Sequence, residues 1–256
     1  MDLRTTFNDN AQNYDSIRPS YPFALFHDIR EYSKITSKST ILEIGIGTGQ
    51  ATYPFLKNNY NIIAIELGSN LAHYTKNKFK KYNNFSIINT SFEEFNSPSN
   101  TYDLIYSATA FHWINPYIGL SKVKRLLKAG GTIALFWNHP FPNRENDPVN
   151  VANRLIYNKY RPSSKPIVEF TYADCKKWEN TLRNYNFTNI VSKLYHRTRT
   201  LNTENYIRLL NTYSDHISLP TNIKEAFEND MKKAINNLGG KINIYDTIDL
   251  YLARKE

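Results

Sequence analysis

The sequence predicts an α/β fold built around a doubly wound, seven-stranded and mostly parallel sheet. Short apolar runs alternate with stretches of helical periodicity along the chain, which is typical of strands joined by right-handed helical crossovers. The chain has 256 residues, of which 41% are hydrophobic. That amount of apolar material is enough to bury the core of one large domain.

The elements of the first half follow in a regular order. Residues 1–40 are polar and aromatic and contain one amphipathic helix, which Pro22 begins at a position that tolerates proline. A strand at 41–44 ends in glycines and opens into a helical stretch that reaches about Lys57. The next elements are a strand at 61–65, a helix at 69–81, strands at 85–88 and 102–106, a helix at 118–127 and a strand at 132–137. Gly130 and Gly131 permit a left-handed exit from the helix before that strand.

The pattern changes after residue 138. The predicted elements are helices at 148–160 and 173–185, a strand at 189–201, helices at 203–213 and 222–237, and a final strand at 246–253. A helical insertion at about 199–243 thus precedes the last strand, and insertions of this size usually form lids or binding surfaces. We interpret residues 1–256 as a single domain, with a helical cap at 1–40, a core at 41–138 and a C-terminal half at 139–256 that carries the helical lid.

Composition narrows the functional classes. The chain has 32 Lys and Arg against 23 Asp and Glu, a net charge of +9, and its densest lysine run lies at 76–81. We favour a solvated helix end over a nucleic-acid patch there, because no nucleic-acid-binding motif accompanies the run. The single cysteine, Cys175, excludes a disulfide framework and a multi-cysteine zinc site. Residues 1–10 lack the apolar core of a secretory signal, and no apolar run approaches the roughly 18 residues of a membrane span, so we expect a cytoplasmic protein.

The turn after the first predicted strand carries the clearest chemical signal. Gly45, Gly47 and Gly49 would leave backbone N–H groups free and let a ligand approach without meeting a Cβ. Glu66 stands at the end of the next strand, where a carboxylate can accept hydrogen bonds from two ribose hydroxyls. Together these features predict an adenosine-containing ligand at the carboxyl ends of the strands.

Two other kinds of nucleotide-binding loop fit the sequence less well than this one. The dinucleotide pattern requires a third glycine at its sixth position, where this chain has Gln50 counted from Gly45, or Thr52 counted from Gly47. No Gly-Lys-Ser or Gly-Lys-Thr occurs, so a nucleoside-triphosphate loop is excluded.

At these residues the sequence resembles class I S-adenosylmethionine-dependent methyltransferases, and more narrowly the small-molecule type 11 subgroup that is similar to trans-aconitate methyltransferases. The matching segments are 41–49, 64–66, 90–93, 102–113, 126–131, and Phe7, Tyr14 and 18–22 near the N-terminus. The resemblance covers most of the chain and is weakest between about 140 and 185. It implies a Rossmann-like methyltransferase fold with strand order 3-2-1-4-5-7-6, in which the last strand is antiparallel.

The resemblance also implies a cofactor and the residues that hold it. The cofactor would be S-adenosylmethionine and the product S-adenosylhomocysteine. The residues assigned to cofactor binding are Tyr14, Arg18, Glu43, Gly45, Gly47, Gly49, Glu66, Leu67, Ser91, Phe92, Ser107 and Ala108. Among these, Glu66 would hold the ribose, Phe92 would border the adenine, and Tyr14 and Arg18 would close over the cofactor. A guanidinium suits a carboxylate partner because it can pair with it bidentately, although a surface salt bridge explains Arg18 equally well.

The chemistry of the acceptor decides whether a base is needed. The methyl donor is already activated, so the protein mainly positions and desolvates the reactants. A carboxylate with a pKa of about 4 is ionised and needs no base, whereas a phenol or an ammonium group does. His112 is the one titratable base beside the expected methyl site, and we weigh a catalytic role for it against a place in the pocket wall.

Other candidates concern the acceptor or a metal. Substrate contacts are predicted for Phe111, Trp113, His139 and Tyr213. Arg197 and Arg199 could meet an anionic acceptor, but solvated strand positions explain them better. The six histidines show no i, i+4 pair and no cysteine partner, so we predict no metal site.

The sequence therefore predicts an enzyme that methylates a small molecule, with O-methylation of a carboxylate favoured. One alternative is methylation of RNA or another nucleic acid, prompted by the net charge of +9 but disfavoured by the absence of a base-reading motif at 107–110. Another is a cofactor-binding pseudoenzyme or regulator, and a nicotinamide oxidoreductase is disfavoured by Gln50. We predict no membrane partner, and a monomer and a homodimer both stay open.

Overall fold

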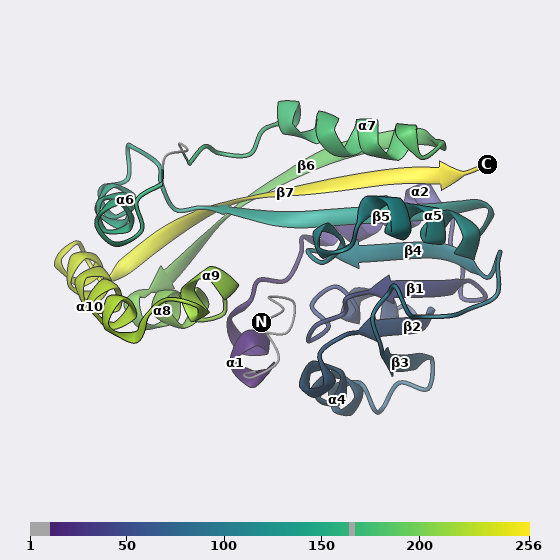
Figure 1. Cartoon of the computed structure of the whole chain (residues 1–256), viewed down its shortest axis with the longest axis horizontal. Helices are drawn as coiled ribbons and strands as arrows, with labels where there is room; N and C mark the ends of the chain where they lie inside the picture. The colour runs from purple at the N-terminus through teal and green to yellow at the C-terminus, as the bar shows by residue number, and fades with distance from the viewer. Residues whose placement is uncertain (1–10, 164–166) are drawn as a thin grey trace.

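The computed structural model of the chain describes residues 11–163 and 167–256, so Phe7 and the first part of the expected N-terminal cap lie outside the described residues. One sheet has the strand order β3-β2-β1-β4-β5-β7-β6. The pairs among β1 to β5 are parallel, whereas β7 runs antiparallel to both β5 and β6 (Figure 1). The predicted fold class and strand order are thus confirmed.

The elements have the following bounds. The strands are β1 (Thr40–Ile44), β2 (Asn61–Glu66), β3 (Phe85–Asn89), β4 (Tyr102–Ala108), β5 (Leu127–Phe141), β6 (Phe187–Asn202) and β7 (Lys241–Lys255). The helices are α1 (Ala11–Ile17), α2 (Phe23–Ser33), α3 (Tyr53–Leu56), α4 (Ser69–Lys78), α5 (Pro116–Leu126), α6 (Pro148–Tyr160), α7 (Lys176–Asn184), α8 (Thr203–Leu210), α9 (Ser214–Ile217) and α10 (Thr221–Asn237). Two short 3-10 turns are η2 (Phe111–Trp113) and η3 (Tyr172–Cys175).

Both faces of the sheet are covered. Leu42 of β1 packs in a core with Leu120 of α5 and Leu182 of α7. Its neighbour Ile41 packs on the other face with Ile29 of α2. Because adjacent residues of a strand point to opposite faces, a strand covered on both sides needs apolar residues throughout. This explains why the central strands appear in the sequence as continuous apolar runs.

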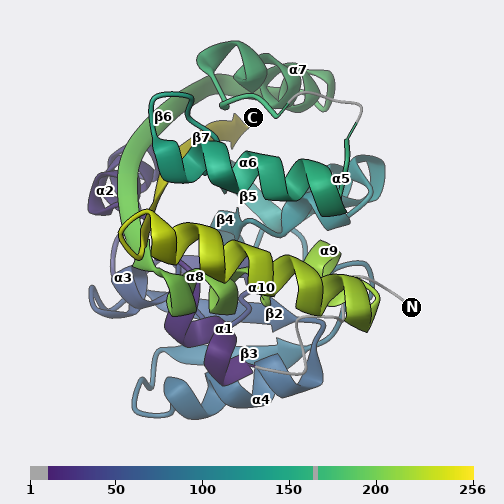
Figure 2. The ribbon, with the colours of Figure 1, turned by 90° about the vertical axis from the view of Figure 1, so that its left-hand side faces the viewer.

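A third core lies under the helices between β6 and β7. Tyr206 of α8 and Phe227 and Met231 of α10 pack there against Ile242 of β7. Helix α6 joins this group, which the sequence did not indicate, and it lies beside α10 (Figure 2). Strands β5, β6 and β7 continue past the other strands and carry these helices (Figure 1). Among the described residues, no helix has the length and apolar composition required to cross a bilayer.

Several predicted boundaries are wrong. The stretch expected to be helical as far as Lys57 contains only α3, because residues 50–52 form turns. Strand β5 begins at Leu127, directly after α5, and the backbone of Leu127 is extended, so no left-handed glycine exit separates the two elements. Gly130 does have φ +71°, but it lies inside β5, close to the bulge that shifts the register with β4. The helix expected at 203–213 ends at Leu210.

Candidate functional site

The turn at 45–49 follows β1 and contains three glycines, and we call it the glycine turn. It folds back over the end of β2. Gly45 N–H donates to the Ile65 carbonyl at 2.9 Å, and Gly47 N–H donates to Glu66 Oε2 at 2.7 Å. The prediction that these amides are free for a ligand is therefore wrong. Gly45 has φ +70°, and a Cβ at this position would lie 2.5 Å from Ala110 Cβ, so only glycine fits.

Glu66 holds its carboxylate between two backbone amides. Its Oε1 accepts from Gly68 N–H at 2.8 Å, and its Oε2 accepts from Gly47. Burial raises the pKa of this carboxyl, although the backbone donors oppose the change. Each oxygen keeps a second lone pair, so the group can still accept hydrogen bonds from a ligand.

Glu43 lies beneath the glycine turn. Its Oε2 accepts from Tyr106 Oη and from Thr52 Oγ1, each at 2.7 Å. Burial raises the pKa of Glu43 to about 8, although the hydrogen bonds from Tyr106 and Thr52 lower it. The carboxyl is therefore mostly protonated at neutral pH, and it ties β1 to β4 and to the turn at 50–52.

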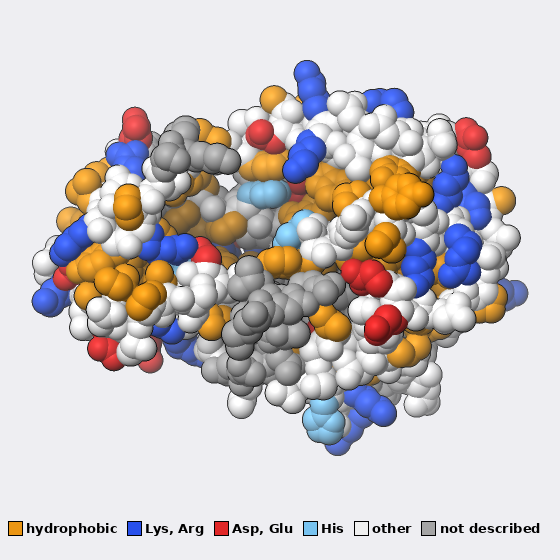
Figure 3. Space-filling view, in the orientation of Figure 1, with side chains coloured by type: hydrophobic (Ala, Val, Ile, Leu, Met, Phe, Trp, Pro, Cys, Tyr) orange, Lys and Arg blue, Asp and Glu red, His pale blue; other side chains and the backbone are white. Residues whose placement is uncertain are grey.

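A cavity of about 330 Å³ opens at the carboxyl ends of the parallel strands. We group its lining by element. The residues at the ends of β1 to β4 and in α4, named here the donor side, are Gly45, Gly47, Glu66, Leu67, Leu71, Ser91, Phe92 and Ala108. The residues from the N-terminal segment, η2, β5 and the region of α9, named here the acceptor side, are Tyr14, Arg18, Tyr21, His112, Trp113, Asn138, Tyr213 and Asp215. Figure 3 shows this face of the molecule hollowed between the helices on its left and the sheet on its right, with histidine side chains at the edge of the hollow.

Most residues predicted to form the site line this cavity, but Glu43, Gly49, Ser107, Phe111 and His139 do not. Gly49 backs onto the Phe79 ring, and Phe111 is fully buried in the core. Ser107 donates to the Ile44 carbonyl at 2.9 Å. His139 stacks on Phe170 and lies 3.2 Å from Asp249 Oδ2. For these five residues, the structure gives no contact with the cavity.

Side-chain alternation along the strands explains three of the five exceptions. Ala108 lines the cavity, whereas its neighbour Ser107 does not, and Asn138 lines it in place of His139. The same holds at β1, where Ile44 lines the cavity and Glu43 points away. Neighbouring residues of a strand point to opposite faces of the sheet. Which member of each pair lines the cavity therefore depends on which face the even-numbered and the odd-numbered residues occupy.

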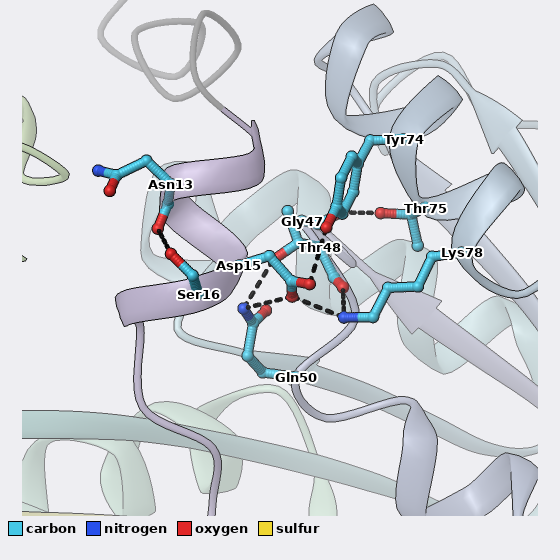
Figure 4. Close-up of polar contacts among 9 residues, drawn as sticks. All are labelled: Asn13, Asp15, Ser16, Gly47, Thr48, Gln50, Tyr74, Thr75 and Lys78. Carbon is cyan, nitrogen blue, oxygen red and sulfur yellow. Dashed lines mark hydrogen bonds and ion pairs between the residues drawn. The ribbon is translucent and has the colours of Figure 1, made fainter.

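Helix α1 is fastened to the glycine turn through Asp15. The Asp15 Oδ1 lies 2.6 Å from Lys78 Nζ of α4, and Gln50 Nε2 donates to the same oxygen at 3.3 Å. The other oxygen accepts from Tyr74 Oη at 2.9 Å, and Lys78 also donates to the Thr48 carbonyl at 2.9 Å (Figure 4). This cluster holds α1, and therefore Tyr14, at the cavity.

Arg18 connects the end of α1 to the helices between β6 and β7. Its guanidinium carbon lies 4.8 Å from the centre of the Tyr14 ring and 4.4 Å from that of Tyr213. Its Nη2 donates to the Thr212 carbonyl at 2.6 Å. A cation between two aromatic faces is favoured by the ring quadrupoles, so these contacts fix a positive charge in the cavity wall.

Behind the acceptor side lies a charged cluster around Asp246. This fully buried carboxylate accepts from Arg197 Nε at 3.0 Å, from Arg199 Nη2 at 2.9 Å and from Asn138 Nδ2 at 3.1 Å. Arg197 Nη2 donates in turn to Asn138 Oδ1 at 3.3 Å. The two arginines are therefore paired with an internal acid, and they orient the amide of Asn138 at the cavity wall.

Comparison with known proteins agrees with this geometry. A family model described as "Methyltransferase domain" matches residues 42–135, which contain the glycine turn, Glu66, Phe92 and His112. An uncharacterized methyltransferase-like protein of Schizosaccharomyces pombe is 26% identical over 228 residues, or 88% of this chain and 83% of that protein. A probable S-adenosylmethionine-dependent methyltransferase of Saccharomyces cerevisiae is 31% identical over 157 residues, or 60% of this chain and 52% of that protein. This chain is a methyltransferase.

Solved structures agree with the fold of the methyltransferase. Phosphoethanolamine N-methyltransferase 2 of Haemonchus contortus, in complex with phosphomonomethylethanolamine and S-adenosylhomocysteine, matches with a TM-score of 0.57 at 13% identity. The match covers 98% of the methyltransferase and 60% of that chain. At this identity the likeness concerns the fold, and the narrower resemblance to trans-aconitate methyltransferases stays a prediction. In the parts of the methyltransferase that the structure describes, no group of three or more His, Cys, Asp or Glu side chains is arranged to hold a metal ion.

Sequence reasoning missed several residues of the methyltransferase cavity and its supports. Asn138 could have been predicted as a cavity residue, because it directly follows a predicted strand at the edge of the sheet where ligands bind. Asp215 lines the cavity from α9, in a region where the sequence gave no chemical motif. Asp15 contacts residues 35 to 63 positions away, so nothing in its local sequence distinguishes it from a solvated acid.

Proposed function

We propose that the methyltransferase binds S-adenosylmethionine on the donor side of the cavity and methylates a carboxylate oxygen of a small molecule on the acceptor side. One observation carries this proposal. A single cavity joins Glu66 and Gly47 to Arg18, His112 and Tyr213, so both reactants would bind in one continuous space. S-adenosylmethionine supplies a methyl group that its bond to a sulfonium already activates.

The donor side suits an adenosine ligand. Among the described residues, no heavy atom lies within 4 Å of a Cβ built on Gly47, which leaves room for a ligand in front of this turn. Glu66 borders that space with two oxygens that can each accept a ribose hydroxyl. Leu67, Leu71 and Phe92 supply the apolar wall that a purine base requires.

The acceptor side suits a small anion. Arg18 presents a guanidinium that Tyr14 and Tyr213 hold in place, and such a planar group can pair bidentately with a carboxylate. The Asp215 carboxylate on the same side lies 2.7 Å from Arg161, which balances its charge. The chain's own contribution is then to orient an ionised acceptor and to exclude water from it.

Two measurements test the proposal. Calorimetric titration with S-adenosylmethionine, S-adenosylhomocysteine and NAD should show micromolar binding of the first two and no binding of NAD. A tritiated methyl-transfer assay should then label citrate, succinate or trans-aconitate, and the product should be an ester that mild base hydrolyses. Binding of NAD alone would overturn the donor assignment. Labelling confined to alcohols or amines would overturn the carboxylate assignment.

A further inference from the structure

The indole of Trp137 makes a hydrogen bond to the imidazole of His112. Trp137 Nε1–H of β5 donates to His112 Nδ1 of η2 at 2.9 Å. The indole is held firmly, because it is buried and stacks on Trp178 with 4.9 Å between ring centres. The backbone N–H of Trp137 also donates to Asp249 Oδ1 at 2.8 Å. His112 therefore meets a donor in a fixed position.

This bond fixes the place of the proton on the imidazole. An indole nitrogen only donates, so His112 Nδ1 must offer its lone pair, and the ring proton of the neutral form must be on Nε2. Burial and the nearby His139 both lower the pKa of His112, which favours the neutral ring. The nitrogen that could take up a proton is thus covered by Trp137.

We infer that Trp137 is a positioning residue that holds His112 as an Nε2–H donor toward the acceptor, so that His112 acts as a substrate-binding donor and not as a general base. This inference rests on the proposed function and refines its acceptor class. Methyl transfer to a carboxylate forms one O–C bond and breaks one S–C bond, whose electron pair stays on sulfur, and no proton moves. Transfer to a hydroxyl or an ammonium group releases a proton that a base must take up. A site whose histidine is a fixed donor suits the first reaction.

Four other titratable side chains at the cavity are protonated phenols or carboxylates with neighbouring donors. Burial raises the pKa of Tyr21 and of Tyr213, so both phenols stay protonated. Both oxygens of Glu66 accept backbone N–H groups, and Asp215 is ion-paired with Arg161. Glu93 lines the cavity beside Lys122, which donates to the Glu93 carbonyl at 3.0 Å. Both oxygens of Glu66 and one oxygen of Asp215 are thus already engaged by donors of the chain.

The tautomer can be measured on the whole chain without any acceptor. Long-range proton–nitrogen NMR correlations of protein labelled with ¹⁵N-histidine distinguish the two neutral tautomers, and His112→Gln assigns the signal. We expect the Nε2–H form in the wild type and a mixture in Trp137→Phe. The matched control is Trp178→Phe, which removes an indole from the same stack but leaves the bond to His112. A wild-type Nδ1–H form, or an unchanged tautomer in Trp137→Phe, would overturn the inference.

Kinetics give the second readout, with citrate and trans-aconitate as probe acceptors. His112→Gln keeps an amide N–H donor and cannot act as a base, so it should retain kcat within about tenfold, while His112→Ala should raise KM for the acceptor by about tenfold. If both variants lose kcat by about a thousandfold at saturating acceptor, His112 is a base and the inference is wrong. If S-adenosylmethionine binds but no carboxylate is labelled, the proposed acceptor class fails, and the NMR experiment alone decides the role of Trp137.

Discussion

Lys78 Nζ of α4 lies 2.6 Å from Asp15 Oδ1 of α1, although 63 residues separate the two in the sequence. Tyr74 and Gln50 donate to the same carboxylate, and Lys78 reaches on to the Thr48 carbonyl. One acid thus joins the N-terminal helix, the glycine turn and α4. Because Tyr14 and Arg18 flank this acid, its contacts bear directly on how the cavity is closed.

Asp15→Asn should weaken binding of S-adenosylmethionine. The amide keeps the shape of the side chain but loses the charge that pairs with Lys78, a pair that is partly exposed and therefore worth about 1 kcal/mol at most. We expect a rise in Kd of about three- to fivefold by calorimetry. Asp230→Asn is the matched control, since Asp230 also accepts from a lysine and a tyrosine, Lys159 and Tyr160, but lies outside the cavity. Equal Kd values for the two variants would show that the Asp15 contacts do not support cofactor binding.

Glu66→Ala should weaken S-adenosylmethionine binding more strongly. Loss of a charged hydrogen-bond acceptor costs about 1.5–3 kcal/mol, which corresponds to a rise in Kd of roughly 10- to 150-fold. Glu145→Ala serves as the control, because Glu145 is highly exposed and its contact with the described residues is a long ion pair with Arg154, at 3.5 Å. An unchanged Kd in Glu66→Ala would mean that the ribose lies elsewhere.

Gly45→Ala should lower the free energy of unfolding by more than the strain of alanine at a positive φ alone would cause. Gly45 and Gly130 have nearly the same φ, +70° and +71°, so alanine at either position bears a similar strain of about 1–2 kcal/mol. At Gly45 the new methyl group also meets a neighbour, Ala110 Cβ at 2.5 Å, whereas at Gly130 it meets no atom of the described residues within 4 Å. Thermal denaturation should therefore give a lower Tm for Gly45→Ala than for Gly130→Ala. Equal Tm values would argue that Ala110 can move away.

Glu43→Gln should change how stability depends on pH. The pKa of Glu43 is about 8 in the folded chain, against 4.5 ordinarily, so the folded state holds a proton that the unfolded state releases. The stabilisation that protonated Glu43 gives the wild-type fold is fully present below about pH 4.5. It is lost as the pH rises from there through 8. Glutamine keeps an acceptor for Tyr106 and Thr52 but does not titrate. The Tm of the variant relative to the wild type should rise by at least 2–4 °C between pH 6 and pH 9, the equivalent of about 1 kcal/mol. A constant difference would contradict the raised pKa.

The core of the fold was predictable because its signals are local. Apolar runs such as 61–65 reveal a strand buried on both faces, and Gly45 and Gly47 mark a turn that few other residues could form. The lengths of β5 and β7 were not predictable in the same way. Both extend beyond their predicted ends into polar positions, such as Asn138 of β5 and Asn243 of β7, that acquire partners only when the strands pair.

The site was predictable where a motif sets the position, and less so where packing does. Glu66 and Phe92 line the cavity as expected, since each follows a parallel strand at its carboxyl end. The sequence does not tell which face of the sheet Asn138 and His139 of β5 each occupy, so it could not show that Asn138 is the one that lines the cavity. The bond between Trp137 and His112 joins residues 25 positions apart, and no spacing rule relates them.

The register of the last two strands bears on how such an enzyme can acquire new acceptors. Asn202, the last residue of β6, pairs with Lys241, the first residue of β7, so the chain leaves the sheet and returns to it at adjacent points. The segment 203–240 therefore contributes Tyr213 and Asp215 to the cavity from outside the sheet. Substitutions at these two positions change one wall of the cavity and leave the paired residues of the strands as they are.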